Sequence, residues 1–144
     1  MPRLVSCLRC MATAADAAAA AAELQQLLGI PKETEEQLHA RLSLLVKQQP
    51  VMLFMKGKRD APFCRFSKAV LQLLQQQGVK QFGTFDVFDD EAVREGLKKF
   101  SDWPTYPQLY VNGELVGGLD VLKAMVEDGS FKGALPASAF EDAQ

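Results

Sequence analysis

A strand-to-helix junction near the middle of the chain constrains the fold more than any other feature. Residues 51–55 (Val-Met-Leu-Phe-Met) form an uninterrupted apolar run, which predicts a short buried β-strand. Residues 61–68 then open a helical pattern, whose apolar face is expected at Val70, Leu71, Leu73 and Leu74. Cys64 therefore lies where a strand gives way to the N-terminus of a helix.

The position of Cys64 predicts a reactive or metal-ligating thiol. At a helix N-terminus, unpaired backbone N–H groups and the positive end of the helix dipole stabilise a thiolate. Arg65 and Lys68 add positive charge in the same segment, and Lys56 ends the preceding strand. The alternative is a small buried hydrophobic residue, the usual role of a lone intracellular cysteine. The cationic neighbours favour the reactive interpretation.

Composition limits the class of protein. A chain of 144 residues with 48% hydrophobic residues can form one compact domain with short tails. Its net charge of −2 gives no general attraction to nucleic acid or to an anionic membrane, so neither is expected as a partner. Three cysteines do not form a disulfide framework, which favours a reducing compartment. No apolar run approaches the ~20 residues of a membrane span.

Residues 1–30 differ from the rest and are expected to form a flexible or targeting tail. Arg3 and Arg9 precede the first acidic residue, and an alanine run follows. Such a segment could be a weak transit peptide, so the cytoplasm is the expected location and the mitochondrion the alternative. Cys7 and Cys10 form a CxxC, but no second pair completes a metal site, and we interpret it as incidental.

The remaining elements alternate between helix and strand. Asn112-Gly113 predicts a tight hairpin turn, and Gly78 ends the helix that follows Cys64. The expected helices begin at Thr34, Cys64, Asp89 and Leu119, and the expected strands cover residues 51–55, 81–87, 108–111 and 114–116. This order predicts an α/β fold with a four-stranded mixed sheet flanked by helices. The domain is expected at residues 31–135, followed by a loose tail at 136–144.

Three regions are expected to meet at one edge of this sheet. Cys64 begins a helix, Pro107 opens a strand, and Gly117-Gly118 precedes the last helix. Pro107 is a candidate for a cis peptide bond, which would turn the backbone of Tyr106 outward to pair with an extended peptide. Two glycines before a helix can bind an anion, and Asp120 can accept a hydrogen bond from an ammonium group.

Basic residues complete the predicted site. Lys56, Arg94 and Lys98 could bind a carboxylate. The site would then hold a small peptide that has a carboxylate at each end and an ammonium group at one of them, beside a thiol. Glutathione has this combination of groups.

Four sequence motifs that contain these residues resemble those of a known family, the monothiol glutaredoxins. In chain order they are Met55-Lys56-Gly57, Cys64-Arg65-Phe66-Ser67, Trp103-Pro104-Thr105-Tyr106-Pro107-Gln108 and Gly117-Gly118-Leu119-Asp120. The resemblance runs from about residue 38 to residue 131. It looks most similar to the glutaredoxin modules of cytosolic multidomain thioredoxin–glutaredoxin proteins.

The resemblance implies a thioredoxin-like fold and a [2Fe–2S] cluster shared between two protomers. Each protomer would give one cysteine, here Cys64, and one bound glutathione thiol, so that four thiolates ligate two irons. Ser67 stands where dithiol relatives have a second cysteine, which excludes an intramolecular disulfide with Cys64. One departure is Arg65, because the family normally has glycine there. Arginine could either swing outward and lower the pKa of the thiol, or crowd the second protomer.

The resemblance also implies the glutathione contacts. Lys56 and Arg94, with Lys98, would bind the glycine carboxylate, and the backbone of Tyr106 would pair with the cysteinyl part. The N–H of Leu119 and the carboxylate of Asp120 would hold the γ-glutamyl end.

Three functional hypotheses follow. In the first, the protein carries or senses iron–sulfur clusters, and transfers them to apo acceptor proteins or pairs with a BolA-like protein, as the family does. In the second, Cys64 acts alone as a glutathione-dependent thiol–disulfide oxidoreductase that removes glutathione from proteins. In the third, the fold has lost its chemistry and serves as an interaction module, which the retained Lys56, Arg94 and Asp120 oppose.

Overall fold

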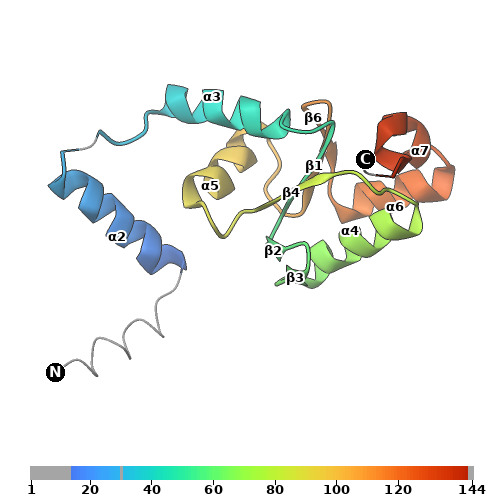
Figure 1. Ribbon diagram of the computed structural model, residues 1–144, viewed down its shortest axis with the longest axis horizontal. Coiled ribbons are helices and arrows are strands. Elements are labelled where there is room, and N and C mark those ends of the chain that lie inside the picture. Colours follow the sequence, from blue (N-terminus) through green and yellow to red (C-terminus); the bar gives the residue numbers. More distant parts are fainter. Residues whose placement is uncertain (1–13, 30, 143–144) are drawn as a thin grey trace, which may run out of the picture.

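The computed structural model describes residues 14–29 and 31–142. Its helices and strands, in chain order, are α2 (Ala14–Leu27), α3 (Glu35–Val46), β1 (Val51–Met55), β2 (Gly57–Lys58), β3 (Ala61–Pro62), α4 (Arg65–Gln76), β4 (Gly83–Asp86), α5 (Glu91–Phe100), β5 (Gln108–Val111), β6 (Glu114–Gly117), α6 (Leu119–Asp128), α7 (Phe131–Ala134) and the 3₁₀ helix η1 (Ala137–Phe140). Figure 1 shows their arrangement.

The main sheet has four strands in the order β4-β1-β5-β6. Strand β1 runs parallel to β4 and antiparallel to β5, and β5 pairs antiparallel with β6. This confirms the predicted mixed sheet. Asn112 and Gly113 join β5 to β6 with φ of 51° and 85°, as a tight hairpin turn requires. Strands β2 and β3 form a separate hairpin that the sequence did not predict, because two-residue strands carry no periodic signal.

Strand β1 is buried on both faces because helices cover both sides of the sheet. Val51, Leu53 and Met55 join one hydrophobic cluster, to which α4 and α6 contribute. Met52 and Phe54 join the other cluster, to which α3 and α5 contribute. Alternate side chains of a strand point to opposite faces, so an uninterrupted apolar run is the expected pattern for a central strand between two helical layers.

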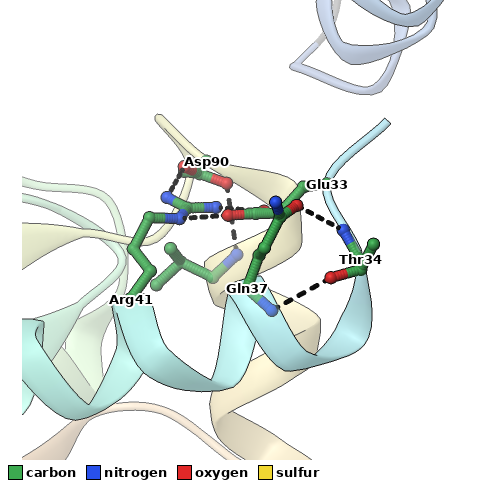
Figure 2. Close-up of polar contacts among 6 residues, drawn as sticks. Glu33, Thr34, Gln37, Arg41 and Asp90 are labelled. Carbon is green, nitrogen blue, oxygen red and sulfur yellow. Dashed lines mark hydrogen bonds and ion pairs between the residues drawn. The ribbon is translucent and has the colours of Figure 1, made fainter. Parts of the chain in front are cut away.

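Helices α3 and α5 have side-chain caps and are joined by an ion pair (Figure 2). The Thr34 hydroxyl accepts from the Gln37 N–H at 3.1 Å, and the Gln37 carbonyl oxygen Oε1 accepts from the Thr34 N–H at 3.0 Å. Asp90 caps α5 by accepting from the N–H of Val93 at 3.2 Å. Arg41 of α3 donates to Asp90 at 2.6 Å and to Glu33 at 2.8 Å. The predicted N-cap of α3 at Thr34 is thus confirmed, and α5 begins at Glu91 with Asp90 as its N-cap, just after the expected Asp89.

Residues 135–142 are packed, contrary to the expected loose tail. Ala139 in η1 is buried in the same cluster as α4 and α6. Its carbonyl oxygen accepts from the N–H groups of Lys80 and Gln81 at 2.7 and 2.9 Å. Leu135 is buried in this cluster too, and Phe140 packs against it. The small and polar composition from Leu135 onward concealed this, because only a few apolar residues and hydrogen bonds to Lys80 and Gln81 hold the segment. The domain limits of 31–135 stay a prediction.

Part of the N-terminal segment expected as a tail forms helix α2, in which Leu24 and Leu27 are exposed. Its flexibility and any targeting role stay predictions. Cys7 and Cys10 lie outside the described residues. No helix within residues 14–29 or 31–142 is long and apolar enough to cross a membrane.

Candidate functional site

A cavity of about 490 Å³ opens at the edge of the sheet where β1 ends. It lies among the N-termini of α4 and α6, helix α5 and the loop before β5. Every residue predicted for the site lines it, namely Lys56, Cys64, Arg94, Tyr106, Leu119 and Asp120. Lys98 lines it too, as do Phe66 and residues 103–105, for which the sequence suggested no role. The topology therefore assembles the predicted residues at one place.

Cys64 is the N-cap residue of α4 and is partly exposed. Partial burial of its sulfur raises the pKa of the thiol, and this is the largest single influence. The N–H groups of Ser67 and Phe66, the positive charge of Lys56 and the Ser67 hydroxyl act in the opposite direction. Together they prevail, so the pKa of Cys64 lies below its ordinary value and the thiolate is favoured.

Lys56 is fixed next to the thiol by its backbone. Its N–H donates to the Ser67 hydroxyl at 3.2 Å, and its carbonyl oxygen accepts from the N–H of Phe63 at 3.0 Å. Ser67 is fully buried. Ser67 thus fastens the end of β1 to the start of α4, a role that sequence reasoning missed because a buried serine resembles any other serine in a helix.

Asp86, at the end of β4, holds the β2–β3 hairpin beside the thiol. Its carboxylate oxygen Oδ1 accepts from the N–H of Gly57 at 3.0 Å and from the N–H of Phe88 at 2.9 Å. Gly57 has a φ of 96°, and a Cβ there would lie 2.5 Å from the nitrogen of Phe63. Glycine is therefore required at this position, both by the backbone conformation and by the close approach of the chain before Cys64.

The loop before β5 presents the backbone of Tyr106 to the cavity. The Tyr106–Pro107 peptide bond is cis, as the sequence predicted. None of the turn, loop and cap hydrogen bonds among the described residues uses the N–H or C=O of Tyr106. The Tyr106 ring is buried, and its hydroxyl donates to the carbonyl oxygen of Arg94 at 2.6 Å. Burial raises the pKa of this phenol, which keeps it protonated as a donor.

Gln108 stabilises the same loop through side-chain hydrogen bonds. It is fully buried, and its amide nitrogen donates to the carbonyl oxygens of Trp103 and Thr105 at 3.0 and 3.2 Å. Its amide oxygen accepts from the hydroxyl of Tyr110 at 2.8 Å. A glutamine at the start of an otherwise apolar strand was the available signal for this role.

The N-terminus of α6 opens onto the opposite side of the cavity. Gly118 is its N-cap and provides no side-chain hydrogen bond, so the first N–H groups of α6 have no side-chain acceptor there. A Cβ at Gly118 would lie 3.2 Å from the carbonyl oxygen of Pro107. Asp120 is exposed in the first turn. The arrangement can accept a carboxylate at the helix end and an ammonium group at Asp120.

Two basic side chains of α5 reach the cavity and retain unused donors. Arg94 lies 3.9 Å from Glu91, a loose contact, and Lys98 lies 3.2 Å from Glu95. The side-chain nitrogens Nε of Arg94 and Nε1 of Trp103 are buried and have no hydrogen-bond partner in the part of the chain that is described. These donors and cations are suited to carboxylate or carbonyl groups of a ligand.

Within residues 14–29 and 31–142, no group of three or more His, Cys, Asp or Glu residues could hold a metal ion. Cys64 is the free cysteine of this part of the chain. A metal or cluster at this site would therefore need ligands from outside the described residues of one protomer.

Comparison with known proteins places these observations in a family. A family model described as Glutaredoxin matches residues 51–116. Monothiol glutaredoxin-S17 of Arabidopsis thaliana is 53% identical over 104 residues, which make up 72% of this chain and 21% of the relative. Glutaredoxin 3 of Danio rerio is 49% identical over 107 residues, 74% of this chain and 32% of the relative. The chain thus spans about a third or less of the length of these two curated relatives.

Solved structures agree with the fold. The reduced apo form of poplar GrxS14 is similar with a TM-score of 0.58 and 38% identity, covering 67% of this chain and 87% of that one. A buckwheat glutaredoxin solved in complex with glutathione has a TM-score of 0.64 over 78% of this chain and all of its own, at 22% identity, which supports the fold alone.

The sheet, the cavity and the sequence matches agree with one another. Cys64, the one cysteine within the described residues, is the N-cap of α4, and the buried Ser67 follows three residues later. The chain belongs to the glutaredoxin family, and these features together with its monothiol relatives make it a monothiol glutaredoxin.

Proposed function

We propose that this monothiol glutaredoxin binds glutathione and uses Cys64 to bridge a [2Fe–2S] cluster between two protomers, in iron–sulfur cluster transfer or iron sensing. The observation that carries the proposal is the position of one thiolate-favouring cysteine in a cavity lined by cations and by a helix N-terminus. A lone thiolate beside a peptide-sized cavity is suited to joining a second, ligand-borne thiolate.

The chemistry of the cavity supports glutathione as the ligand. Unused donors at Arg94 and Trp103 require acceptors, and glutathione has carboxylates at both ends. We assign the glycine carboxylate to Lys56, Arg94 and Lys98, the cysteinyl part to the backbone of Tyr106, and the γ-glutamyl end to the N–H of Leu119 and the carboxylate of Asp120.

The donor set fits a shared cluster better than a metal ion held by one chain. Cys64 supplies one thiolate, and no metal-holding group exists among the described residues. Two protomers and two glutathione molecules would supply the four thiolates of a [2Fe–2S] cluster. When bound, such a cluster supplies iron and sulfide for transfer, and the protein's own part is to keep Cys64 ionised and glutathione oriented beside it.

The alternative is a glutathione-dependent oxidoreductase that uses Cys64 alone. The lowered pKa of this partly exposed thiol favours it, because a thiolate is the attacking species in disulfide exchange. The Cys64 thiolate would attack the glutathione sulfur of a glutathionylated protein, and the protein thiolate would leave. A second glutathione would then attack the Cys64–glutathione disulfide, releasing oxidised glutathione and restoring Cys64.

Arg65 bears on both hypotheses. Its guanidinium lies 5.0 Å from the centroid of the Phe66 ring, outside the residues that line the cavity. Lys56, rather than Arg65, is the charge that lowers the pKa of Cys64. We therefore expect Arg65 to leave glutathione binding intact and to act where a partner approaches.

The test is anaerobic reconstitution with iron, sulfide and glutathione, read by visible absorption and by the mass of the complex in solution. We expect a coloured, glutathione-requiring dimer for the native chain and none for Cys64→Ser. Lys132→Ser on α7 serves as a control that removes a charge elsewhere. A native protein that stays colourless, and yet reduces a glutathionylated substrate, would replace the cluster proposal by the oxidoreductase.

We also propose the partners and the cellular location of the protein. We expect apo iron–sulfur proteins or a BolA-like protein to receive the cluster, in the cytoplasm. A fusion of residues 1–30 to a fluorescent reporter tests the mitochondrial alternative, because a transit peptide would direct the reporter to that organelle.

A further inference from the structure

Positive charge is concentrated around the thiol of a chain that is acidic overall. Residues 56–68 contain five Lys and Arg residues and one Asp, a formal charge of +4, whereas the whole chain carries −2. The rest of the chain therefore carries −6. Such a segregation of charge creates a local field that the net charge of the protein conceals.

Three of these cations flank Cys64, one at the end of β1 and two in the first turn of α4. Lys56 lines the cavity, and Arg65 lies over the Phe66 ring, which lines it as well. Lys68 follows Cys64 by one helical turn, and its N–H donates to the Cys64 carbonyl oxygen at 2.9 Å, so the two residues share a face of α4. Arg59 is turned away, because it stacks at 3.9 Å on the Phe82 ring.

Exposed aromatic rings accompany the cations. The exposed fraction is 76% for Phe63 and 47% for Phe66, which makes them two of the large apolar side chains most open to solvent among the described residues. The Phe63 ring also lies 6.2 Å from that of Phe88. Arginine and aromatic residues are the types enriched at the centres of protein interfaces. We call Lys56, Phe63, Arg65, Phe66 and Lys68 the thiol rim.

We propose that the thiol rim docks a partner protein through a segment rich in Asp and Glu beside the cysteine that exchanges with Cys64. This rests on the proposed function in one respect, namely that Cys64 is the working thiol. The acidic groups near the rim include Asp60, Asp86 and Asp89 of the adjoining segments and the exposed Asp120, which lines the same cavity as Cys64. Asp86 is engaged by the N–H groups of Gly57 and Phe88. Because the rim is cationic, it favours a partner segment of opposite charge.

The test measures disulfide exchange with two short peptides of equal length, each with one cysteine joined to 5-thio-2-nitrobenzoate. In one peptide glutamates flank the cysteine, and in the other lysines do. The Cys64 thiolate attacks the peptide sulfur, the bond to thionitrobenzoate breaks, and the thionitrobenzoate thiolate that leaves is measured by its absorbance. Cys7→Ser and Cys10→Ser form the background, and the same protein with Cys64→Ser gives the blank.

We expect the glutamate peptide to react roughly tenfold faster than the lysine peptide at low ionic strength, with the ratio falling as salt is added. Rates with β-mercaptoethanol, a neutral thiol, correct for the intrinsic reactivity of each peptide. Arg65→Gly and Lys68→Ser should each lower the ratio severalfold. Lys132→Ser, which removes an equal charge from α7 on another side of the molecule (Figure 1), should leave it unchanged.

Equal corrected rates for the two peptides, or an equal loss in Lys132→Ser, would overturn the proposal. The assay contains no iron, so its result is independent of cluster binding. If the protein forms a coloured dimer but shows no charge preference, the docking proposal fails and the proposed function stands. If it shows the charge preference but never takes up a cluster, the docking proposal stands and the cluster proposal fails.

Discussion

The four helices that flank the sheet differ at their N-termini according to where those ends lie. Helices α3 and α5 begin with capping side chains, Thr34 and Asp90, neither of which lines the cavity. Helices α4 and α6 begin at the cavity with Cys64 and Gly118, neither of which forms a side-chain capping hydrogen bond. The protein thus gives up the stabilisation of a side-chain cap, about 1 kcal/mol at α4 but only a few tenths of a kcal/mol at α6, because glycine is itself a tolerated N-cap. At these two ends the free N–H groups serve a thiolate or a ligand.

Among the variants that test this comparison, we expect the largest effect from Cys64→Ser. Serine is a good N-cap, so we expect the free energy of unfolding to rise by about 0.5–1 kcal/mol while cluster binding and thiol exchange are lost completely. Chemical denaturation and visible absorption measure the two effects, with Cys64→Ala as the uncapped control. A serine variant no more stable than the alanine variant would refute the idea that the missing cap has a cost.

Adding a cap at the other open helix should impair ligand binding. Gly118→Asp places a carboxylate at the N-terminus of α6, where it competes for the N–H groups and repels an anionic ligand. Its Cβ would also lie 3.2 Å from the Pro107 carbonyl oxygen. We expect glutathione to bind at least about tenfold more weakly, since 1.4 kcal/mol is one factor of ten. Calorimetry measures the affinity, and Gly133→Asp, at a position with open space around it, is the control.

Removing a cap from the structural helices should reduce stability without affecting the site. We expect Thr34→Ala to lower the free energy of unfolding by about 1 kcal/mol, and Asp90→Ala by about 1–2 kcal/mol because it also loses Arg41. The alkylation rate of Cys64 should not change in either variant. If Asp90→Ala altered that rate, the separation between structural and functional helix ends would be wrong.

The smallest expected effect concerns the pH dependence of Cys64. Its pKa is below the ordinary value, so the alkylation rate should reach half of its maximum at a lower pH than for a free thiol. Lys56→Met should shift this midpoint upward, since the Lys56 charge helps to lower the pKa. A depressed pKa stabilises the fold above the unfolded-state value and loses that effect as pH falls through the folded value. An unchanged midpoint in Lys56→Met would contradict the assignment.

Local patterns were sufficient to predict most of the elements. The central strand was visible because burial on both faces requires an uninterrupted apolar run. Helix α3 was visible because Thr34 is a good N-cap residue and Glu35 and Glu36 follow it in the first turn. Helix η1 and the β2–β3 hairpin were missed, because each depends on contacts with distant residues. Ala139 is packed against α4 and α6, and Gly57 is bonded to Asp86.

The candidate site divides in the same way. Motif residues such as Cys64, Lys56 and Asp120 could be named in advance, because their chemistry and spacing resemble those of a family. The supporting residues could not. Gln108 acts through hydrogen bonds to carbonyl oxygens of the loop just before it, and Ser67 through the N–H of Lys56 at the end of β1. No spacing rule specifies those partners, because they depend on how the loop folds back and how α4 packs on β1. The contact of Arg65 with the Phe66 ring was likewise open until the structure was known.

By itself, the sequence determined the family, the mixed sheet and the identity of the thiol, because short-range periodicity, turn residues and motif order carry that information. Tertiary structure alone decided which helix ends remain open, which buried side chains hold the cavity walls, and how exposed the basic and aromatic residues around Cys64 are. These are properties of packing between elements distant in the chain, and local sequence patterns do not encode them.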